Sequence, residues 1–408
     1  MTTYQDALRL ILDLAQPLPA RFVPLEDALG RVAAGPVLAP EPVPPFTNSA
    51  MDGFALRAED GASASPERPV RLPVLGEIPA GHAASVALRP GEAYRIMTGG
   101  AMPEGADAIV PVEEAKAADG QVELVRPPRP GDHVRLAGED IQAGGLVVPA
   151  GRVLRPAELG VLAAIGQAGV AVHPRPRVAV ITTGNELVDA GERPGPGQIR
   201  DANIHSLTAQ VRAAGALPIG FPRVPDRREA VAAALAEALA GADVVLTNGG
   251  ISVGDFDYIK DVLEGMGARQ VFWRVAQKPG GPLGLWQLQG RLVFGIPGNP
   301  VAAMLMFEEY VRPALRRMMG FSCLHRPERT GVMAAPWRKR ADGRLNFLRV
   351  TARDEGGQLR VALTGPQGSG LLSSMMLANA LALIPADTQA LPAGGEILLH
   401  LIDEPEDH

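Results

Sequence analysis

Cysteine is nearly absent from this sequence, since Cys323 is the only one among its 408 residues. A single cysteine excludes an internal disulfide and any cysteine-rich metal site, and it favours a reducing compartment. Aromatic residues make up only 4% of the chain, which disfavours a protein that stacks the bases of single-stranded nucleic acid. The histidines are scattered without the spacing of zinc ligands, so we do not expect a zinc site.

Long apolar runs are also missing, because no stretch approaches the ~20 uninterrupted apolar residues of a transmembrane helix. Residues 1–14 carry Asp6 and place apolar residues at helical spacing, so they do not resemble a signal peptide. The net charge of −6 argues against non-specific binding to nucleic acid or to an anionic membrane. We therefore expect a cytoplasmic protein whose partners are neither nucleic acids nor membranes.

The most regular pattern lies in residues 175–320, where β-rich apolar runs alternate with helical stretches. This alternation is typical of βαβ units and predicts a mostly parallel sheet that is covered on both faces. The expected strands cover residues 178–182, 217–221, 244–247, 271–275 and 292–296. The expected helices cover residues 203–214, 227–240, 255–266 and 299–319.

The flanking regions predict smaller modules. Residues 3–16 and 25–34 have the periodicity of two short helices, and the prolines of residues 36–45 predict an extended crossing. Short strands with frequent proline and glycine follow, and further strands are expected near the C-terminus. We therefore predict a multidomain α/β plus β fold. Its parts are a discontinuous N-terminal helical and extended domain (1–45 and 139–172), a small β domain (46–138), a central α/β domain (173–322) and a C-terminal β-barrel-like domain (323–408).

One loop between a predicted buried strand and a predicted helix contains three glycines, Gly249, Gly250 and Gly254. Glycines let the backbone approach a ligand closely, and N–H groups ahead of a helix present a positive dipole end to phosphate. Asp255 and Asp257 beside such a loop suit a bridging Mg²⁺ ion. The spacing alone is equally compatible with a tight turn capped by Asp255, with Asp257 on a solvated face.

Ligands of open α/β sheets bind outside the carboxyl ends of the strands, so residues directly after each predicted strand are candidates for a site. Here they include three carboxylates, Glu186, Asp226 and Asp257, together with Lys278 and two glycine-containing loops. Amides suit phosphate oxygens, carboxylates suit a metal, and a lysine offsets negative charge, which predicts a phosphorylated ligand with Mg²⁺. Each component also has a structural explanation, since Asp226 could cap a helix, Lys278 could be a surface residue, and residues 297–300 could form a turn.

Several motifs occur in order along nearly the whole chain. The most specific are Asn-Ser-Ala-Met-Asp-Gly at residues 48–53 and Pro-Gly-Asn-Pro at residues 297–300. The others are Arg-Ile-Met-Thr-Gly at 95–99, Gly-Glu-Asp-Ile at 138–141, Thr-Gly-Asn-Glu-Leu at 183–187, Gly-Gly-Ile-Ser-Val-Gly at 249–254 and Lys-Pro-Gly at 278–280. Together they resemble the MoeA family of molybdopterin molybdenumtransferases, which includes the E domain of gephyrin.

The resemblance implies an elongated subunit of four modules, usually a homodimer, whose central domain is similar to the molybdopterin-adenylylating proteins MogA and MoaB. It also implies a reaction in which adenylylated molybdopterin and molybdate give molybdenum cofactor and AMP, with Mg²⁺ or a similar cation. A molybdopterin-adenylylating protein and molybdoenzyme maturation factors are the further partners that it suggests.

The resemblance also assigns roles to individual residues. The implied catalytic residues are Asp52, Asp140, Glu186, Asp226, Asp257 and Lys278, and the implied metal ligands are Glu186, Asp226 and Asp257. The implied ligand-binding residues are Thr98, Thr183, Gly184, Asn248, Gly249, Gly250, Ser252, Gly254, Pro297, Gly298, Asn299, Arg349 and Ser369. Because Asp52 and Asp140 lie far from the α/β domain in sequence, we predict that the N-terminal modules of one subunit close over the α/β rim of the other.

The sequence departs from the family pattern at Gly281, where a second lysine is common, and at Asn346, where an acidic residue is common. The missing ammonium at Gly281 could weaken anion binding or change the choice between molybdate and tungstate. Two other functions stay open at this point. One is adenylyl transfer to molybdopterin, which residues 175–320 alone would permit. The other is a non-enzymatic scaffold of the gephyrin kind, which would need a ligand groove between modules and would not depend on Asp52 or Asp226.

Overall fold

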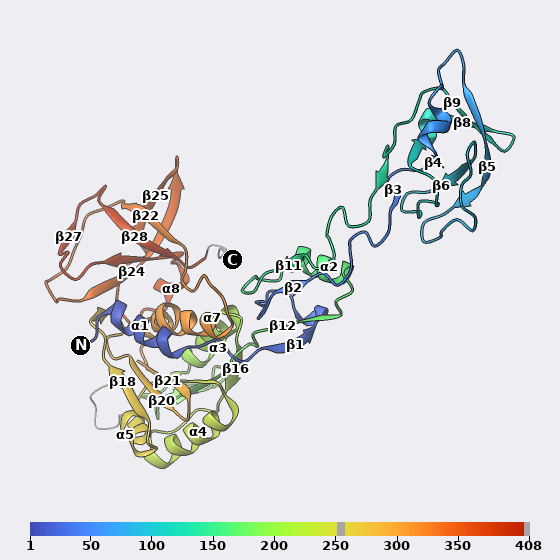
Figure 1. Ribbon diagram of the computed structural model, residues 1–408. Helices are drawn as coiled ribbons and strands as arrows, with labels where there is room; N and C mark the ends of the chain where they lie inside the picture. The colour runs from blue at the N-terminus through green and yellow to red at the C-terminus, as the bar shows by residue number, and fades with distance from the viewer. Residues whose placement is uncertain (251–257, 404–408) are drawn as a thin grey trace. The chain divides into compact units, whose positions relative to one another are not determined.

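The chain divides into two compact units in the computed structural model, which describes residues 1–250 and 258–403 (Figure 1). The first unit consists of Met1–Arg21 together with Ala171–His408, and the second consists of Phe22–Val170. Within the described residues, none of the helices combines the length and the apolar character that are needed to cross a bilayer.

A six-stranded sheet forms the core of the α/β domain in the first unit. Figure 1 shows this sheet among its helices, beside the strands of the C-terminal region. Four neighbouring strands run parallel, and β20 is antiparallel to the strands on either side of it. The carboxyl ends of every strand but β20 therefore lie at one edge, which confirms the prediction of a mostly parallel sheet. In spatial order the strands are β16 (Leu217–Gly220), β13 (Arg177–Thr182), β17 (Val244–Asn248), β21 (Arg291–Ile296), β20 (Gly284–Leu288) and β18 (Arg269–Trp273).

The strand β20 is missing from the sequence-based prediction. Its apolar run follows the proline- and glycine-rich residues 279–282, which indicate a loop. It then turns back into β21 through Gln289 and Gly290, whose φ angles are 51° and 77°. Two consecutive positive φ values are typical of the tight turn that joins antiparallel neighbours, although glutamine is an unusual residue at such a position. The turn was therefore not recognisable from residue type alone.

Helices cover both faces of the sheet, because alternate strand residues point to opposite sides. Val178 and Val180 of β13 face one core, and Ala179 and Ile181 face the other. The first face is covered by α1 (Tyr4–Leu14), α3 (Asn203–Ala213), α6 (Pro300–Met306) and α7 (Arg312–Met318), with a π-helical turn at Phe307–Val311 between the last two. The second face is covered by α4 (Arg228–Gly241) and α5 (Tyr258–Gly265).

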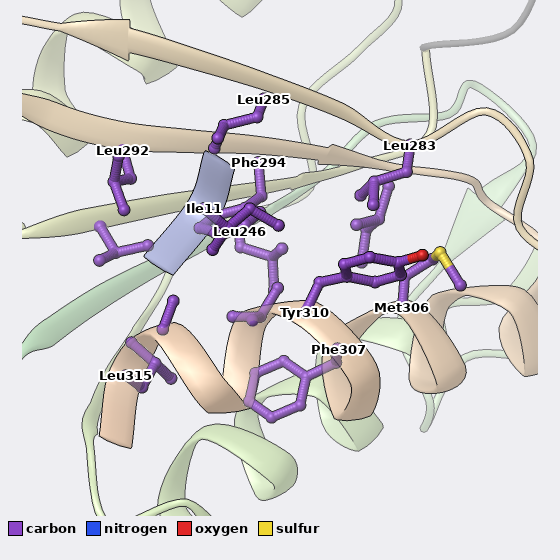
Figure 2. Packing of buried hydrophobic residues seen from close by; sticks show 14 of the residues in the cluster. Ile11, Leu246, Leu283, Leu285, Leu292, Phe294, Met306, Phe307, Tyr310 and Leu315 are labelled. Carbon is purple, nitrogen blue, oxygen red and sulfur yellow. The ribbon is translucent and has the colours of Figure 1, made fainter. Parts of the chain in front are cut away.

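The N-terminal helix α1 belongs to this α/β core. Ala7 and Ile11 are fully buried, and Figure 2 shows Ile11 packed among side chains that include Leu246 and Phe294 of the central strands. This placement differs from the predicted grouping of residues 1–45 with 139–172. The helical periodicity identifies the apolar face of α1 but says nothing about which module covers it.

The prediction of a helix over residues 25–34 is wrong. Only Leu25–Asp27 forms a single 3₁₀ turn. The N–H groups of Gly30 and Ala33 donate instead to the carbonyl oxygens of Leu154 and Arg152, at 2.8 and 2.9 Å. Gly30 also has a φ of 70°, which ends helical geometry. Pairing with a segment far along the chain therefore overrides the local periodicity.

The C-terminal region of the first unit forms a closed five-stranded barrel, as the sequence predicts in outline. Its strands follow one another around the barrel as β24, β25, β22, β28 and β26, and β26 pairs again with β24. Their bounds are β22 (Glu328–Met333), β24 (Leu345–Glu355), β25 (Gln358–Leu363), β26 (Ala380–Ile384) and β28 (Glu396–Leu401).

The barrel is joined to the α/β domain by main-chain hydrogen bonds. The short strand β19 (Gln277–Lys278) leaves the α/β domain and pairs in parallel with the start of β24. The N–H of Leu345 also donates to the carbonyl oxygen of Ala276 at 3.1 Å. At a second point, the N–H of Val301 in α6 donates to the carbonyl oxygen of Ser369 at 3.1 Å.

The second unit contains a six-stranded sheet of its own, in agreement with the predicted small β module. In spatial order its strands are β7 (Ala108–Pro111), β4 (Gly53–Leu56), β6 (Ala93–Ile96), β5 (Val70–Ile78), β9 (Gln121–Leu124) and β8 (Ala115–Ala118). The flanking segments of this unit pair through β2 (Val37–Leu38) and β11 (Leu146–Val148), next to the helix α2 (Pro156–Ala164).

A buried polar cluster lies where α1, the π-helical turn and the barrel meet. The Tyr4 hydroxyl donates to Glu309 Oε2 at 2.9 Å, and His400 Nδ1 lies 3.0 Å from both carboxylate oxygens of Glu309. His400 Nε2 lies 3.5 Å from Glu328 Oε1. Burial by itself lowers the pKa of His400, but the hydrogen bond and charge of Glu309, followed by Glu328, outweigh it and raise the pKa above its ordinary value of 6.5.

This cluster predicts a stability that falls with rising pH. The folded protein holds the His400 proton more tightly than the unfolded chain, so the contribution is complete below pH 6.5 and is lost as the pH rises through the raised pKa. We expect the Tm of the first unit to decline over this range in the wild type and the decline to be smaller in His400→Gln. Thermal unfolding across the neutral pH range measures the Tm of both proteins. An equal decline of Tm with pH in the wild type and in His400→Gln would contradict the prediction.

Candidate active site

A cavity of about 890 Å³ opens at the carboxyl edge of the α/β sheet, inside the first unit. One side of its wall comes from residues that end or follow neighbouring strands, such as Thr183 after β13, Asn248 at the end of β17 and residues 297–300 after β21. The other side comes from the barrel region, with Arg344 and residues 367–369. The cavity therefore lies where the strand-end rule predicts a ligand site.

Nine of the predicted site residues line this cavity. Glu186 and Lys278 are both exposed to it, so a carboxylate and an ammonium face the same space. An arrangement of this kind can bind a metal ion and an anion side by side. The nine residues are Thr183, Glu186, Asn248, Gly250, Lys278, Pro297, Gly298, Asn299 and Ser369.

Asp226 is not among the residues that line the cavity, but it is hydrogen-bonded to the loop that carries Glu186. The N–H of Asn185 donates to Asp226 Oδ2 at 3.1 Å, and the N–H of Asp226 donates to Asn185 Oδ1 at 3.2 Å. Because Asn185 precedes Glu186 directly, these two bonds hold together the loops that carry Glu186 and Asp226. Gly184 completes this turn, and a Cβ atom there would lie 2.7 Å from Glu186 Oε2.

Gly249 brings the loops after β13 and β17 into contact. Its φ is 91°, and a Cβ atom at this position would lie 2.7 Å from the carbonyl oxygen of Thr183 and 3.0 Å from its Oγ1. Only glycine combines this backbone conformation with such a close approach. Gly249 does not line the cavity itself, but its close approach to the lining residue Thr183 helps to shape the wall.

The predicted metal site is only partly described. Ser252, Gly254 and Asp257 lie outside the residues that the structure describes, so the geometry of the predicted set Glu186, Asp226 and Asp257 remains a prediction. In residues 1–250 and 258–403, no group of three or more His, Cys, Asp or Glu side chains is placed to hold a metal ion. The two described carboxylates offer oxygen ligands alone, which fits Mg²⁺ better than a softer metal.

Sequence reasoning missed several cavity residues, including Asp201, Asn203 and Arg344. Asp201 is buried; its Oδ2 accepts a hydrogen bond from Thr182 Oγ1 at 2.5 Å, and its Oδ1 accepts one from a backbone N–H of α3 at 3.0 Å. Asp201 and Asn203 follow only the two-residue strand β15 (Ile199–Arg200), which the sequence does not predict, and Asn203 is the first residue of α3. The strand-end rule, applied to the predicted strands, therefore passes over both residues. Arg344 reaches the cavity only because β19 pairs with β24.

Arg349 supports the cavity wall instead of lining it. Its side chain is fully buried, with Nε donating to Ser374 Oγ at 3.0 Å and a terminal nitrogen donating to the carbonyl oxygen of Gly368 at 3.0 Å. Its backbone N–H donates to Gln367 Oε1 at 2.8 Å. Burial lowers the pKa of the guanidinium. Arg349 thus holds residues 367–369 against the cavity, while direct ligand binding by Arg349 remains a prediction.

The remaining predicted residues lie in the second unit. Asp52 Oδ1 accepts hydrogen bonds from the N–H of Thr98 at 2.7 Å and from its Oγ1 at 2.8 Å. These bonds lower the pKa of Asp52, so its carboxylate stays charged. Asp140 is exposed, and its N–H donates to the carbonyl oxygen of Val43 at 3.1 Å.

Comparison with known protein families accounts for almost the whole chain. Residues 2–166 match the MoeA N-terminal region (domain I and II), residues 179–317 match a probable molybdopterin binding domain, and residues 330–402 match the MoeA C-terminal region (domain IV). A molybdopterin molybdenumtransferase 2 from Mycobacterium tuberculosis is 39% identical over 402 residues, covering 97% of this chain and 98% of the relative. The chain belongs to the MoeA family.

Further relatives agree with MoeA membership. A molybdopterin molybdenumtransferase from Nostoc is 35% identical over 425 residues, covering 98% of this chain and 93% of the relative. The crystal structure of a MoeA protein from Pyrococcus horikoshii has a TM-score of 0.86 at 32% identity, covering 99% of this chain and all of that one. The MoeA multidomain fold and the expected transferase class are thereby confirmed.

Proposed function

We propose that this MoeA-family chain transfers molybdenum from molybdate to molybdopterin in the cavity of its first unit. The observation that carries the proposal is the meeting of Glu186, Lys278 and the glycine-containing strand ends around one space of about 890 Å³. This volume suits a ligand larger than molybdate alone, within the usual range of small-molecule sites. The chain matches curated molybdopterin molybdenumtransferases over nearly their full length, and this similarity supports the same substrates.

The proposal includes adenylylated molybdopterin as the substrate and AMP as a product. A pterin phosphate joined to AMP carries several negative charges, which backbone N–H groups of the strand-end loops and Lys278 can bind. Glu186 and Asp226, with Asp257, would hold Mg²⁺, which supplies Lewis-acid stabilisation of phosphate charge when it is bound. The two hydrogen bonds between Asn185 and Asp226, which join the loops that carry Glu186 and Asp226, support this role.

The experiment that tests the proposal supplies full-length protein with pre-adenylylated molybdopterin, molybdate and Mg²⁺. We expect AMP release that depends on all three components, together with formation of molybdenum cofactor. ATP consumption with molybdopterin, without AMP release from the adenylylated substrate, would overturn the proposal and favour molybdopterin adenylyltransferase activity.

We also propose a cytoplasmic homodimer in which the second unit of one subunit serves the cavity of the other. The charged Asp52 and its bonds to Thr98 support a binding role for the second unit, because an exposed, ionised carboxylate is available to a cation or a donor group. Light scattering of the purified protein measures the oligomeric state, and a monomer at assay concentration would contradict this part of the proposal.

Gly281 provides a test of anion binding in the cavity. A Cβ atom at Gly281 would lie 3.4 Å from the carbonyl oxygen of Gln277 and 3.5 Å from that of Val275, which is ordinary contact. Lysine therefore fits here and adds a second ammonium near Lys278. We expect Gly281→Lys to lower the KM for molybdate by about 2- to 5-fold, the range of a partly exposed ion pair. Gly281→Gln is the uncharged control, and an equal effect of both changes would contradict an electrostatic origin.

A further inference from the structure

Asn203, the first residue of α3, bridges the loops that follow two neighbouring strands. Its Nδ2 lies 2.7 Å from Asn248 Oδ1 at the end of β17 and 2.7 Å from the carbonyl oxygen of Gly298 beyond β21. Asn248 Nδ2 in turn donates to the carbonyl oxygen of Pro297 at 2.7 Å. All four residues line the cavity, so this amide network forms part of its wall.

The chemistry of the network fixes the orientation of both amides. The carbonyl oxygens of Pro297 and Gly298 can only accept hydrogen bonds, so each asparagine must turn its NH₂ group toward the β21 loop. The two hydrogens of Asn203 Nδ2 are then both used, one by Gly298 and one by Asn248. An asparagine side chain at position 203 thus donates to two loops at once through a single nitrogen.

The start of α3 is itself held in place. Asp201 is bonded to Thr182 at the end of β13 and to the N–H of Ile204 in the first turn of α3. Asn203 therefore projects from a helix start that is anchored to a third strand. The network joins the carboxyl ends of β13, β17 and β21, which are adjacent in the sheet.

We propose that Asn203 is a positioning residue for molybdenum transfer, which fixes the cavity-facing backbone of residues 248–250 and 297–299. It acts through Asn248 and Gly298 and does not need to touch the reacting atoms. This inference rests on the proposed reaction taking place in the cavity. A binding loop must keep its N–H groups in place to favour the reactive geometry, and two anchored loops lose less order when substrate binds.

Few residue types can replace asparagine in this role. Serine has one hydrogen to donate, so it can serve only one of the two acceptors. Aspartate has the same shape, but it places a carboxylate against two oxygen acceptors and turns both attractions into repulsions. Protonation of that carboxyl restores one donor, so the defect of Asn203→Asp should shrink as the pH falls.

The test measures kcat and KM for adenylylated molybdopterin in the full-length wild type and in Asn203→Asp. We expect kcat/KM to fall by about 10- to 100-fold at neutral pH, as for the loss of two hydrogen bonds that shape a site. The ratio of variant to wild-type kcat/KM should rise toward low pH. A residue with a purely structural role would not give this pH-dependent recovery.

Asn379 in the barrel offers a matched control. Its Oδ1 accepts a hydrogen bond from the N–H of Ala352 at 2.7 Å, and its Nδ2 donates to the carbonyl oxygen of Ala352 at 2.8 Å. We expect Asn379→Asp to lower the Tm and to keep the wild-type kcat/KM at every pH. If Asn203→Asp does not fold, Asn203→Ser replaces it, with a smaller loss of kcat/KM and a Tm near that of the wild type.

An unchanged kcat/KM in a folded Asn203 variant would overturn the inference, as would a loss that does not depend on pH in Asn203→Asp. A failure of the Asn203 inference can be distinguished from a failure of the proposed function. Full activity in Glu186 and Asp226 variants would reject the assigned carboxylates. A pH-dependent loss at Asn203 in the same assays would still support its positioning role.

Discussion

Replacing Glu186 by glutamine is expected to lower the kcat/KM of molybdenum transfer by about 100- to 1000-fold, the cost of removing one preorganised charge from a reacting site. Glutamine keeps the shape of the cavity wall, so the Tm should stay near that of the wild type. Asp226→Asn keeps an oxygen that can accept the Asn185 bond but removes the charge, and we expect a loss of about 10- to 100-fold, as for a group that supports a metal ligand. Steady-state assays over a range of Mg²⁺ concentrations measure both effects.

Glu192 provides the control for this experiment. It is an exposed glutamate in the loop that follows β14 (Leu187–Val188), outside the cavity lining. Glu192→Gln makes the same chemical change nearby, and we expect wild-type kinetics. If Glu186→Gln retained full activity, or if its Mg²⁺ requirement matched that of Glu192→Gln, the assignment of the rim carboxylates to metal binding would be wrong.

Replacing Gly249 by alanine should damage both stability and activity. The new methyl group would meet the main chain of Thr183 at 2.7 Å, a distance that real Cβ atoms do not adopt, and the φ of 91° would become strained. We expect a loss of about 1–3 kcal/mol in the free energy of unfolding. The displaced loop should also lower kcat/KM by about 100-fold, because small misplacements of binding groups are costly. Denaturant unfolding and steady-state kinetics measure the two effects separately.

Substitution of Gly290 by alanine is a control that introduces backbone strain without a steric clash. It has a similar positive φ of 77° in the turn between β20 and β21, but a Cβ atom there would have nothing within 4 Å. Gly290→Ala should therefore lose stability through strain alone and keep its activity. Equal kinetic losses in the two variants would show that the close approach to Thr183 is not what shapes the cavity.

The sheet was predictable because its residues satisfy two requirements at once. The β13 run is apolar from Val178 to Ile181, as the middle of a strand buried on both faces must be, and the helices that follow carry one apolar face each. The wrong helix prediction for residues 25–34 has a non-local cause. Residues 25–34 have helical periodicity, yet their backbone bonds go to residues 152–154, and a long-range pairing of this kind leaves no trace in a short window.

The site residues also divide into those that the sequence predicts and those that it does not. Thr183, Glu186 and Asn248 were predictable because strand order in a parallel sheet brings the ends of strands together. Asn203 was not, because its importance depends on the distances to Asn248 and Gly298, and an asparagine at the start of a helix is ordinary in sequence. Arg349 was identified only through the family resemblance, and its burial among residues 367–374 gives it a supporting place that resemblance alone does not convey.

The pairing of β19 with β24 limits how proteins of this kind can diversify. Main-chain bonds across this joint do not depend on side-chain identity, so substitutions can accumulate on both sides without loosening it. A chimaera that takes its barrel from a distant relative faces a stricter condition. The start of the β24 strand in the incoming barrel must pair with Gln277–Lys278 in the same register. Otherwise, the segment taken from the relative must include its own counterpart of Gln277–Lys278.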